Sequence, residues 1–149
     1  MFGNIFDHLT ESTQTLFACN LTRNINEYRN VIIHLPPNIE LDGSFSAIIQ
    51  KLARLPFSIA TSIEMRSDNT EQINKYKSLF TKRNKVKFIL NKYDKLTDYE
   101  SASKPNCLDI YFLLRKESVA YKTVNNQFAS NRISDDMEKD FIVVVPGLG

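Results

Sequence analysis

The sequence predicts an α/β or α+β fold: a single layer-packed domain over residues 1–149, with about three helices on a mixed sheet of about five or six strands. Three observations lead to this prediction. Apolar residues make up 42% of the 149-residue chain, which is enough for one sizeable core. Segments with helical spacing alternate with short apolar runs, and strand-like segments then follow one another. No linker, internal repeat or low-complexity tract divides the chain.

The N-terminal segment has the spacing of an amphipathic helix. Apolar residues recur there at i, i+3, i+4 and i+7, namely Phe2, Ile5, Phe6 and Leu9. We expect Leu16 and Phe17 to extend this stripe and the Asn-rich residues 20–30 to form a connector. The β-branched run of residues 31–35 then ends at Pro36, which predicts a short buried strand.

A second helix is predicted between Ser44 and Pro56. Residues 42–43 are Asp-Gly, a turn signal, Ser44 is a favourable N-cap, and Pro56 cannot continue a helix. Apolar residues repeat at helical spacing within these limits: Phe45, Ile48, Ile49 and Leu52. After Pro56, apolar and mostly polar residues alternate over residues 57–65, which predicts a strand with one buried side.

The third helix is predicted after Asp68. Asp68 and Glu71 resemble a capping box, with Asp in the place usually taken by Ser or Thr, and the helix should extend to about Arg83. Residues 86–90 then predict another strand. Right-handed crossovers through the two helices would make the strands at 31–35, 57–65 and 86–90 parallel.

The C-terminal third predicts strands in succession. Residues 108–114 are strongly apolar, and residues 119–124 could return beside them as an antiparallel hairpin across Lys116-Glu117. A short helix is expected within residues 134–139. The uninterrupted run Phe141–Val145 is typical of a strand covered on both faces, so we expect it at the centre of the sheet.

Glycine usage excludes the common nucleotide-binding loops. A phosphate-cradling loop needs glycines for close backbone approach, but the chain has no glycine between Gly43 and Gly147. The two cysteines lie far apart and predict reduced thiols. With no signal-peptide pattern and no apolar run of membrane-spanning length, we expect an intracellular chain, cytoplasmic or part of a virion, without a membrane partner.

Residues capable of catalysis or metal binding are scattered. His8, His34, Cys19 and Cys107 stand singly, whereas zinc sites use closely spaced ligand pairs. A nucleophilic pair of Cys107 and His34 is the enzymatic alternative, but both adjoin apolar strands, which favours a structural role. An acidic group could hold a cation, although stabilising a helix near Ser134 is the favoured interpretation: Asp135, Asp136, Glu138 and Asp140. A metal-nuclease pattern around Asp109 fails, because the required Lys is missing. No catalytic residue, metal or cofactor is predicted.

Positive charge gathers in one part of the chain. The net charge is only +2, yet residues 75–95 are rich in lysine with only Asp94 opposing it. With interleaved aromatic residues, this stretch is the candidate nucleic-acid contact, through Lys75, Lys82, Arg83, Lys85 and Lys87. The competing interpretation, which we favour, is that the lysines solvate a helix and protect a strand edge from aggregation.

The sequence therefore predicts a non-enzymatic structural or protein-interaction protein that acts in assembly. We expect a protein partner or a homo-oligomer, because the terminal segments are the places where a chain can dock onto a neighbouring subunit. Nucleic-acid binding through residues 75–95 and an enzyme with an unrecognised site are the alternatives. The high usage of Asn, Ile and Lys is typical of AT-rich coding sequence, as in many phages and viruses.

Overall fold

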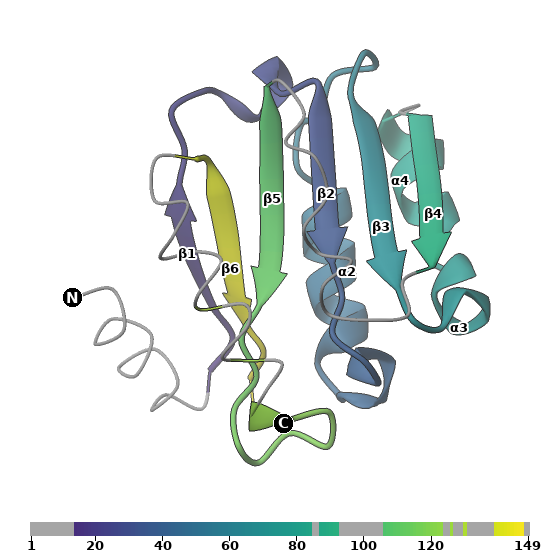
Figure 1. Cartoon of the computed structure of the whole chain (residues 1–149). Coiled ribbons are helices and arrows are strands. Elements are labelled where there is room, and N and C mark those ends of the chain that lie inside the picture. Colours follow the sequence, from purple (N-terminus) through teal and green to yellow (C-terminus); the bar gives the residue numbers. More distant parts are fainter. Residues whose placement is uncertain are drawn as a thin grey trace.

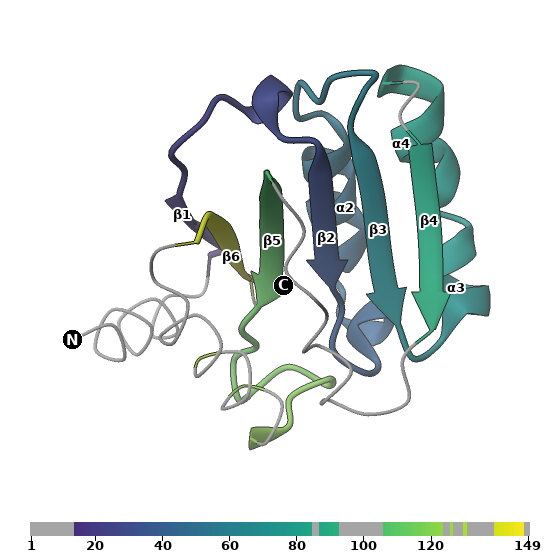
Figure 2. The same ribbon diagram turned by 45° about the horizontal axis from the view of Figure 1, so that its top comes forward.

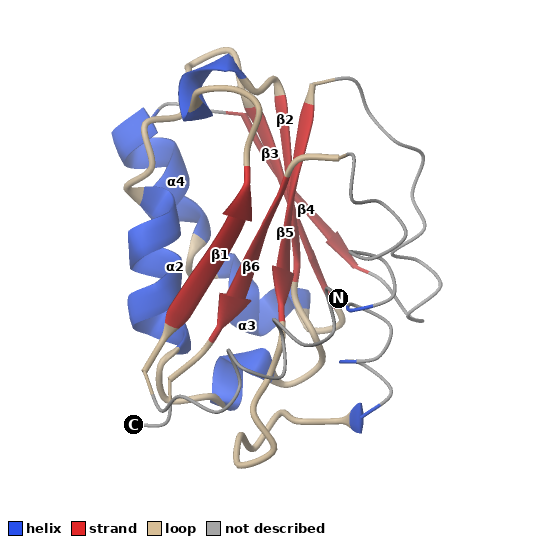
Figure 3. Cartoon of the chain, turned by 90° about the vertical axis from the view of Figure 1, so that its left-hand side faces the viewer, coloured by secondary structure: helices blue, strands red, loops and turns tan. Residues whose placement is uncertain are grey.

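A computed structural model of the chain describes residues 14–84, 87–92, 106–123, 126, 130 and 139–147. In this part of the chain, six strands form one mixed sheet, with α2 and α4 packed on one of its faces (Figures 1 and 3). The strands are β1 (Leu16–Asn20), β2 (Asn30–His34), β3 (Ser62–Ser67), β4 (Lys87–Lys92), β5 (Cys107–Phe112) and β6 (Phe141–Val145). The helices are α2 (Phe45–Ala53), α3 (Thr70–Asn74) and α4 (Lys77–Asn84), and the 3₁₀ turns are Ile25–Glu27 and Ile39–Leu41. The α/β class predicted from the sequence is confirmed.

The strand order is β1-β6-β5-β2-β3-β4. Strands β2 to β6 all run parallel to one another, and β1 pairs antiparallel with β6. The predicted parallel arrangement of β2, β3 and β4 is therefore confirmed. β6 is paired on both sides, with β1 and with β5, but it lies next to the edge strand β1 and not at the predicted centre of the sheet. After β1, the chain forms β2, β3 and β4, which lie side by side in this order. The next strand, β5, lies on the other side of β2. The order thus reverses between β2 and β5.

The main apolar core lies between the sheet and its helices. Alternate residues of β2, β3 and β5 point into it, and α2 contributes the stripe predicted from the sequence: Phe45, Ile48, Ile49 and Leu52. Figure 2 shows α2 and α4 behind the sheet. A smaller apolar cluster, with Tyr111 and Val143 among its members, lies on the opposite face of β5 and β6. Among the described residues, no helix is long and apolar enough to cross a lipid bilayer.

One helix prediction and one strand prediction are wrong. Leu16 and Phe17 begin β1 and do not continue a helix, because their segment pairs with β6, a partner distant in sequence. Residues 119–123 contain no strand and form no hairpin: residues 119–120 lie in a turn, and both sides of β5 are already paired, with β2 and with β6. The predicted N-terminal helix over Phe2 to Leu9 and the helix within residues 134–138 lie outside the described residues.

The boundaries of the strand predicted over residues 57–65 also differ. β3 starts at Ser62, because the segment before it is a turn in which the Thr61 amide donates to the Ser58 carbonyl at 2.9 Å. Ile59, expected on the buried side, is 71% exposed in this turn. Glu64, expected on the polar side, is buried. The strand is therefore covered on both faces.

The helix boundaries show how local hydrogen bonds set the start of each helix. Ser44 is the N-cap of α2 as predicted, but its side chain makes no capping bond. Instead, Asp42 Oδ1 accepts hydrogen bonds from the amide and the hydroxyl of Ser44, at 3.0 and 2.7 Å. The predicted capping box at Asp68 does not form, because the next helix begins at Thr70. That helix breaks at Lys75 and Tyr76, which separates α3 from α4.

Candidate functional site

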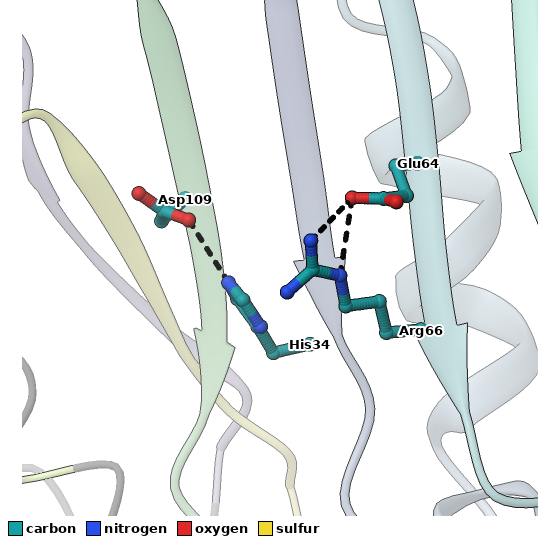
Figure 4. Close-up of polar contacts among 4 residues, drawn as sticks. All are labelled: His34, Glu64, Arg66 and Asp109. Carbon is teal, nitrogen blue, oxygen red and sulfur yellow. Dashed lines mark hydrogen bonds and ion pairs between the residues drawn. The ribbon is translucent and has the colours of Figure 1, made fainter. Parts of the chain in front are cut away.

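Charged and polar side chains occupy the middle of the sheet face opposite α2 and α4. They come from three neighbouring strands: His34 from β2, Glu64 and Arg66 from β3, and Asp109 from β5 (Figure 4). The strand register places His34 beside Arg66, and places Ile32 between Glu64 and Asp109. A central sheet position for charged groups is costly unless each of them is paired. The pairing within this cluster therefore decides its chemistry.

The first pair joins β2 to β5. His34 Nε2 lies 2.9 Å from Asp109 Oδ1, and the His34 ring stacks on Tyr111 with centroids 4.7 Å apart and planes at 4°. Because an ionised carboxylate only accepts hydrogen bonds, Nε2 carries the proton in this contact. The hydrogen bond and the ring stack together fix the orientation of the imidazole. The structure thus places His34 in the core, in agreement with the favoured interpretation of the sequence.

The second pair lies within β3. Arg66 donates from Nε and Nη2 to Glu64 Oε2, at 3.1 and 2.7 Å. The two residues are two positions apart, so they project from the same face of the strand. Their charges cancel locally, and both side chains are buried. Sequence reasoning missed this pair, although two opposite charges at i and i+2 within an apolar strand are a usable signal.

Cys107 does not join His34. It begins β5 opposite Asn30, and His34 lies four register positions further along β2. At about 3.3 Å per residue, this separates the two backbone positions by about 13 Å. The structure therefore brings His34 together with Asp109 and separates it from the thiol of the enzymatic alternative. Within the described residues, no three His, Cys, Asp or Glu side chains gather as a metal site would require.

Asp140 is the one residue of the acidic group at positions 135–140 that lies within the described residues. Its role there is structural. It accepts hydrogen bonds from the hydroxyls of Tyr28 and Thr22, with shortest distances of 2.7 Å to each. Burial, followed by the hydrogen bond and the charge of Asp140, raises the pKa of Tyr28 well above the usual value for tyrosine. Asp140 thereby ties the start of β6 to the segment before β2. Asp135, Asp136 and Glu138 lie outside the described residues.

The basic residues singled out in the sequence do not form one helical face. Lys75 lies in the break between α3 and α4, with Nζ 5.3 Å from the centre of the Tyr76 ring, whereas Lys82 lies in α4. Arg83 also belongs to α4, Lys87 begins β4 and is exposed, and Lys85 lies outside the described residues. Helix periodicity cannot align Lys75 with Lys82, because the helix is interrupted between them.

Lys82 instead faces a hollow between α2 and α4. This hollow, of about 320 Å³, is lined by Gln50, Ala53, Arg54, Ser78, Leu79 and Lys82. Arg54 and Lys82 lie at the C-terminal ends of the two helices, where positive charge stabilises the helix dipole. This structural role accounts for both cations. Nucleic-acid binding by the basic stretch stays a prediction.

The β1 edge is the second feature of functional interest. In the sheet that the structure describes, β1 is an edge strand, and its residues Leu-Phe-Ala-Cys-Asn carry no charge. Phe17 is 40% exposed and Leu21, just after the strand, is 37% exposed. A groove of about 280 Å³ opens beside the strand, lined by Phe17, Cys19, Lys51, Leu52, Leu55 and Ile142. Figure 3 looks onto this edge of the molecule.

Two sets of hydrogen bonds hold the β1 edge in place. The buried Arg115 donates to the backbone carbonyls of Gln14 and Pro146, which flank β1 and β6. The amide of Gly147 donates to Thr15 Oγ1 at 2.8 Å. The segment before β1 is therefore fastened to the segment after β6. These hydrogen bonds keep β1 in register with β6, its neighbour in the described part of the sheet.

Comparison with protein families, with curated proteins and with solved structures finds no match for this chain.

Proposed function

We propose that the protein is an interaction domain that associates with a second copy of itself through the β1 edge. The observation that carries this proposal is the contrast between the two edges of the sheet. β4, the other edge strand, begins and ends with lysine, and its Lys87 is exposed. Lysines on an edge strand oppose pairing with another chain, whereas β1 has no such protection.

A second copy of β1 is the partner that fits this edge best. An uncharged strand meets its own copy without like-charge repulsion. An antiparallel pair of β1 strands about a two-fold axis uses the same surface on both subunits, as most homodimers do. It would join two sheets into one and satisfy the outward backbone groups of both edges.

Side chains on the helix-side face of β1 supply the apolar contact. A two-fold axis perpendicular to the sheet places Phe17 of each copy on the same face, next to the groove beside Cys19 and Leu52. The exposed part of Phe17 would then be removed from water in both subunits. Burial of apolar area contributes about 25 cal/mol per Å², and aromatic side chains dominate such interfaces.

Light scattering coupled to size-exclusion chromatography tests the proposal. We expect the wild-type protein to have twice the mass of one chain, at low and at moderate salt. Phe17→Asp places a charge on each edge and should give monomers, and Cys19→Lys, on the same face, should do likewise. Ile59→Asp is the matched control, because Ile59 is an exposed apolar residue in a turn away from β1.

Two results would overturn self-association through β1. One is a wild-type protein that stays monomeric over the whole concentration range. The other is a Phe17→Asp variant that is folded and still dimeric. Absorbance at 260 nm, recorded in the same runs, reports whether nucleic acid accompanies the protein, and thus tests the alternative assigned to residues 75–95.

A further inference from the structure

The groove beside β1 lies where the outer strands of the sheet extend past the helices. Figure 1 shows α2 behind β2, α3 and α4 towards β4, and β6 and β1 further out on the other side. Among the described helices, α2 is therefore the neighbour of this part of the sheet. The groove is lined by residues of β1, of β6, and of the end of α2 with the turn after it: Phe17, Cys19, Lys51, Leu52, Leu55 and Ile142.

The interior of the groove is apolar. Phe17 and Cys19 lie on the helix-side face of β1, because Ala18 between them packs into the cluster on the opposite face. Leu52 and Ile142 are buried members of the main core, so a ligand in the groove would contact the core itself. The groove volume of about 280 Å³ is close to the lower limit of small-molecule pockets, which suits a single short alkyl chain.

One positive charge lies at the rim of the groove. Lys51 is exposed, and its Nζ lies 6.0 Å from the centre of the Phe17 ring, over one wall. A contact of this length with an aromatic ring leaves the ammonium charged and accessible to an anion. Within the described part of the chain, no carboxylate forms an ion pair with Lys51. A lysine side chain covers apolar surface with its stem while its ammonium stays in water.

The other lining residues add no charge. None of the described residues that line the groove is acidic, and partial burial raises the pKa of the Cys19 thiol above its usual value. Cys19 is therefore a neutral thiol at neutral pH. The groove thus combines an apolar interior with a single cation, which favours a ligand with an apolar chain and an anionic head group. A cationic head group would be repelled by Lys51.

We propose that this groove binds an unbranched medium-chain carboxylate. The alkyl chain lies against Phe17, Leu52 and Ile142 and is removed from water, which supplies most of the affinity. The carboxylate accepts a hydrogen bond from the Lys51 ammonium at the rim, where water still reaches both charges. Lys51 thus selects the head group, and the apolar walls select the chain.

This site does not rest on self-association. Strand pairing uses the outward backbone groups of β1, whereas the carboxylate uses side chains on the helix-side face of the strand. The two proposals have separate readouts, which are the mass of the particle for self-association and the titration of a ligand for the groove.

Four probes separate the contributions of head group and chain: octanoate, n-octylammonium, 1-octanol and butyrate. Each is titrated, below its micelle-forming concentration, into wild-type protein with ¹³C-labelled methyl groups, and the methyl resonances of Leu52, Leu55 and Ile142 are followed. We expect saturable shifts with octanoate, weaker binding of 1-octanol, and the weakest binding for n-octylammonium and butyrate. Absence of octanoate binding, or binding of n-octylammonium or butyrate as tight as that of octanoate, would overturn the proposal.

Lys51→Glu tests the role of the charge. It replaces attraction of the carboxylate by repulsion, so octanoate binding should weaken by about tenfold. The same change should make n-octylammonium bind more tightly than octanoate, which inverts the order found for the wild type. Lys75→Glu is the matched control. Lys75 is another exposed lysine over an aromatic ring, with Nζ 5.3 Å from the centre of the Tyr76 ring, and it does not line the groove.

Cys19→Phe tests the position of the chain. The larger side chain occupies space in the groove, so binding of both octanoate and 1-octanol should fall. A folded Lys51→Glu variant that keeps the wild-type order of the probes, or a folded Cys19→Phe variant that binds octanoate unchanged, would contradict the proposal. If either variant does not fold, the selectivity of the wild type among the four probes decides. A monomeric wild type that binds octanoate would refute self-association and support this site.

Discussion

His34 Nε2 at the end of β2 lies 2.9 Å from Asp109 Oδ1 in β5, across the point where the strand order reverses. The two residues are 75 positions apart in the chain, and the pairing of β2 with β5 brings them together. The contact thus fixes a carboxylate on the sheet and ties the two halves of the sheet to each other. Its loss should lower the free energy of unfolding.

Replacement of His34 by Ala should destabilise the protein. It removes a hydrogen bond to a charged group and the stacked contact with Tyr111, so we expect a loss of about 2–4 kcal/mol in the free energy of unfolding. Urea denaturation measures this change. A loss below about 0.5 kcal/mol would show that the His34–Asp109 contact contributes little to the fold.

Removing one member of the Glu64–Arg66 pair should lower the free energy of unfolding strongly, whereas replacing both members by apolar residues should change it little. Arg66→Met removes the guanidinium that donates twice to the buried Glu64 carboxylate, which we expect to cost about 3–5 kcal/mol. The double variant Glu64→Leu with Arg66→Met removes both charges and should recover most of that loss. Unfolding free energies of the wild type, both single variants and the double variant form the complete cycle. A double variant no more stable than Arg66→Met would contradict this account.

The contribution of Tyr28 to the free energy of unfolding should decrease at alkaline pH. Burial and Asp140 raise the pKa of Tyr28 in the folded protein, so its contribution is fully present below about pH 10, the value expected in the unfolded chain. It is lost as the pH rises from there towards the folded pKa. Tyr28→Phe should cost about 1.5–3 kcal/mol at neutral pH, and the difference from the wild type should shrink above pH 10. A constant difference up to pH 11 would refute the linkage.

Cys19 should react slowly for a thiol on an exposed strand. Cys19 is exposed as a residue, but partial burial of its thiol raises the pKa above the usual value, so less thiolate is present at pH 8 than for a free cysteine. We expect iodoacetamide to label Cys19 more slowly than a model peptide thiol at pH 8, with the rate rising as the pH increases. Labelling at the peptide rate would argue against this environment. The Cys107→Ser variant isolates the signal of Cys19.

The strands that the sequence predicted correctly have strong local signals. Residues 31–35 and Phe141–Val145 are dense in β-branched residues, and such runs form strands wherever the sheet accommodates them. β1 has no such signal, because Leu-Phe-Ala-Cys-Asn contains no β-branched residue. Its conformation comes from pairing Leu16 with Val145, which no local pattern reveals. The same dependence on distant partners explains the wrong hairpin at residues 119–124.

The polar cluster could be predicted only in part. His34 and Asp109 both stand out in the sequence, but the sequence suggests other partners for them, Cys107 for His34 and a lysine, which is missing, for Asp109. Which residues face each other depends on the strand order and register, and these follow from the crossovers and not from sequence spacing. Arg66 and Glu64 were missed because β3 was expected to have one solvent-facing side.

Concentration-dependent hydrogen exchange of β1 tests self-association most directly. Mass spectrometry follows amide exchange in the peptide that contains Leu16–Asn20, at high and at low protein concentration, with the β4 peptide Lys87–Lys92 as the internal reference. We predict that exchange in β1 slows as the concentration rises, that β4 does not change, and that Phe17→Asp abolishes the effect. Exchange in β1 that is the same at every concentration would contradict pairing of the β1 edge with a second copy.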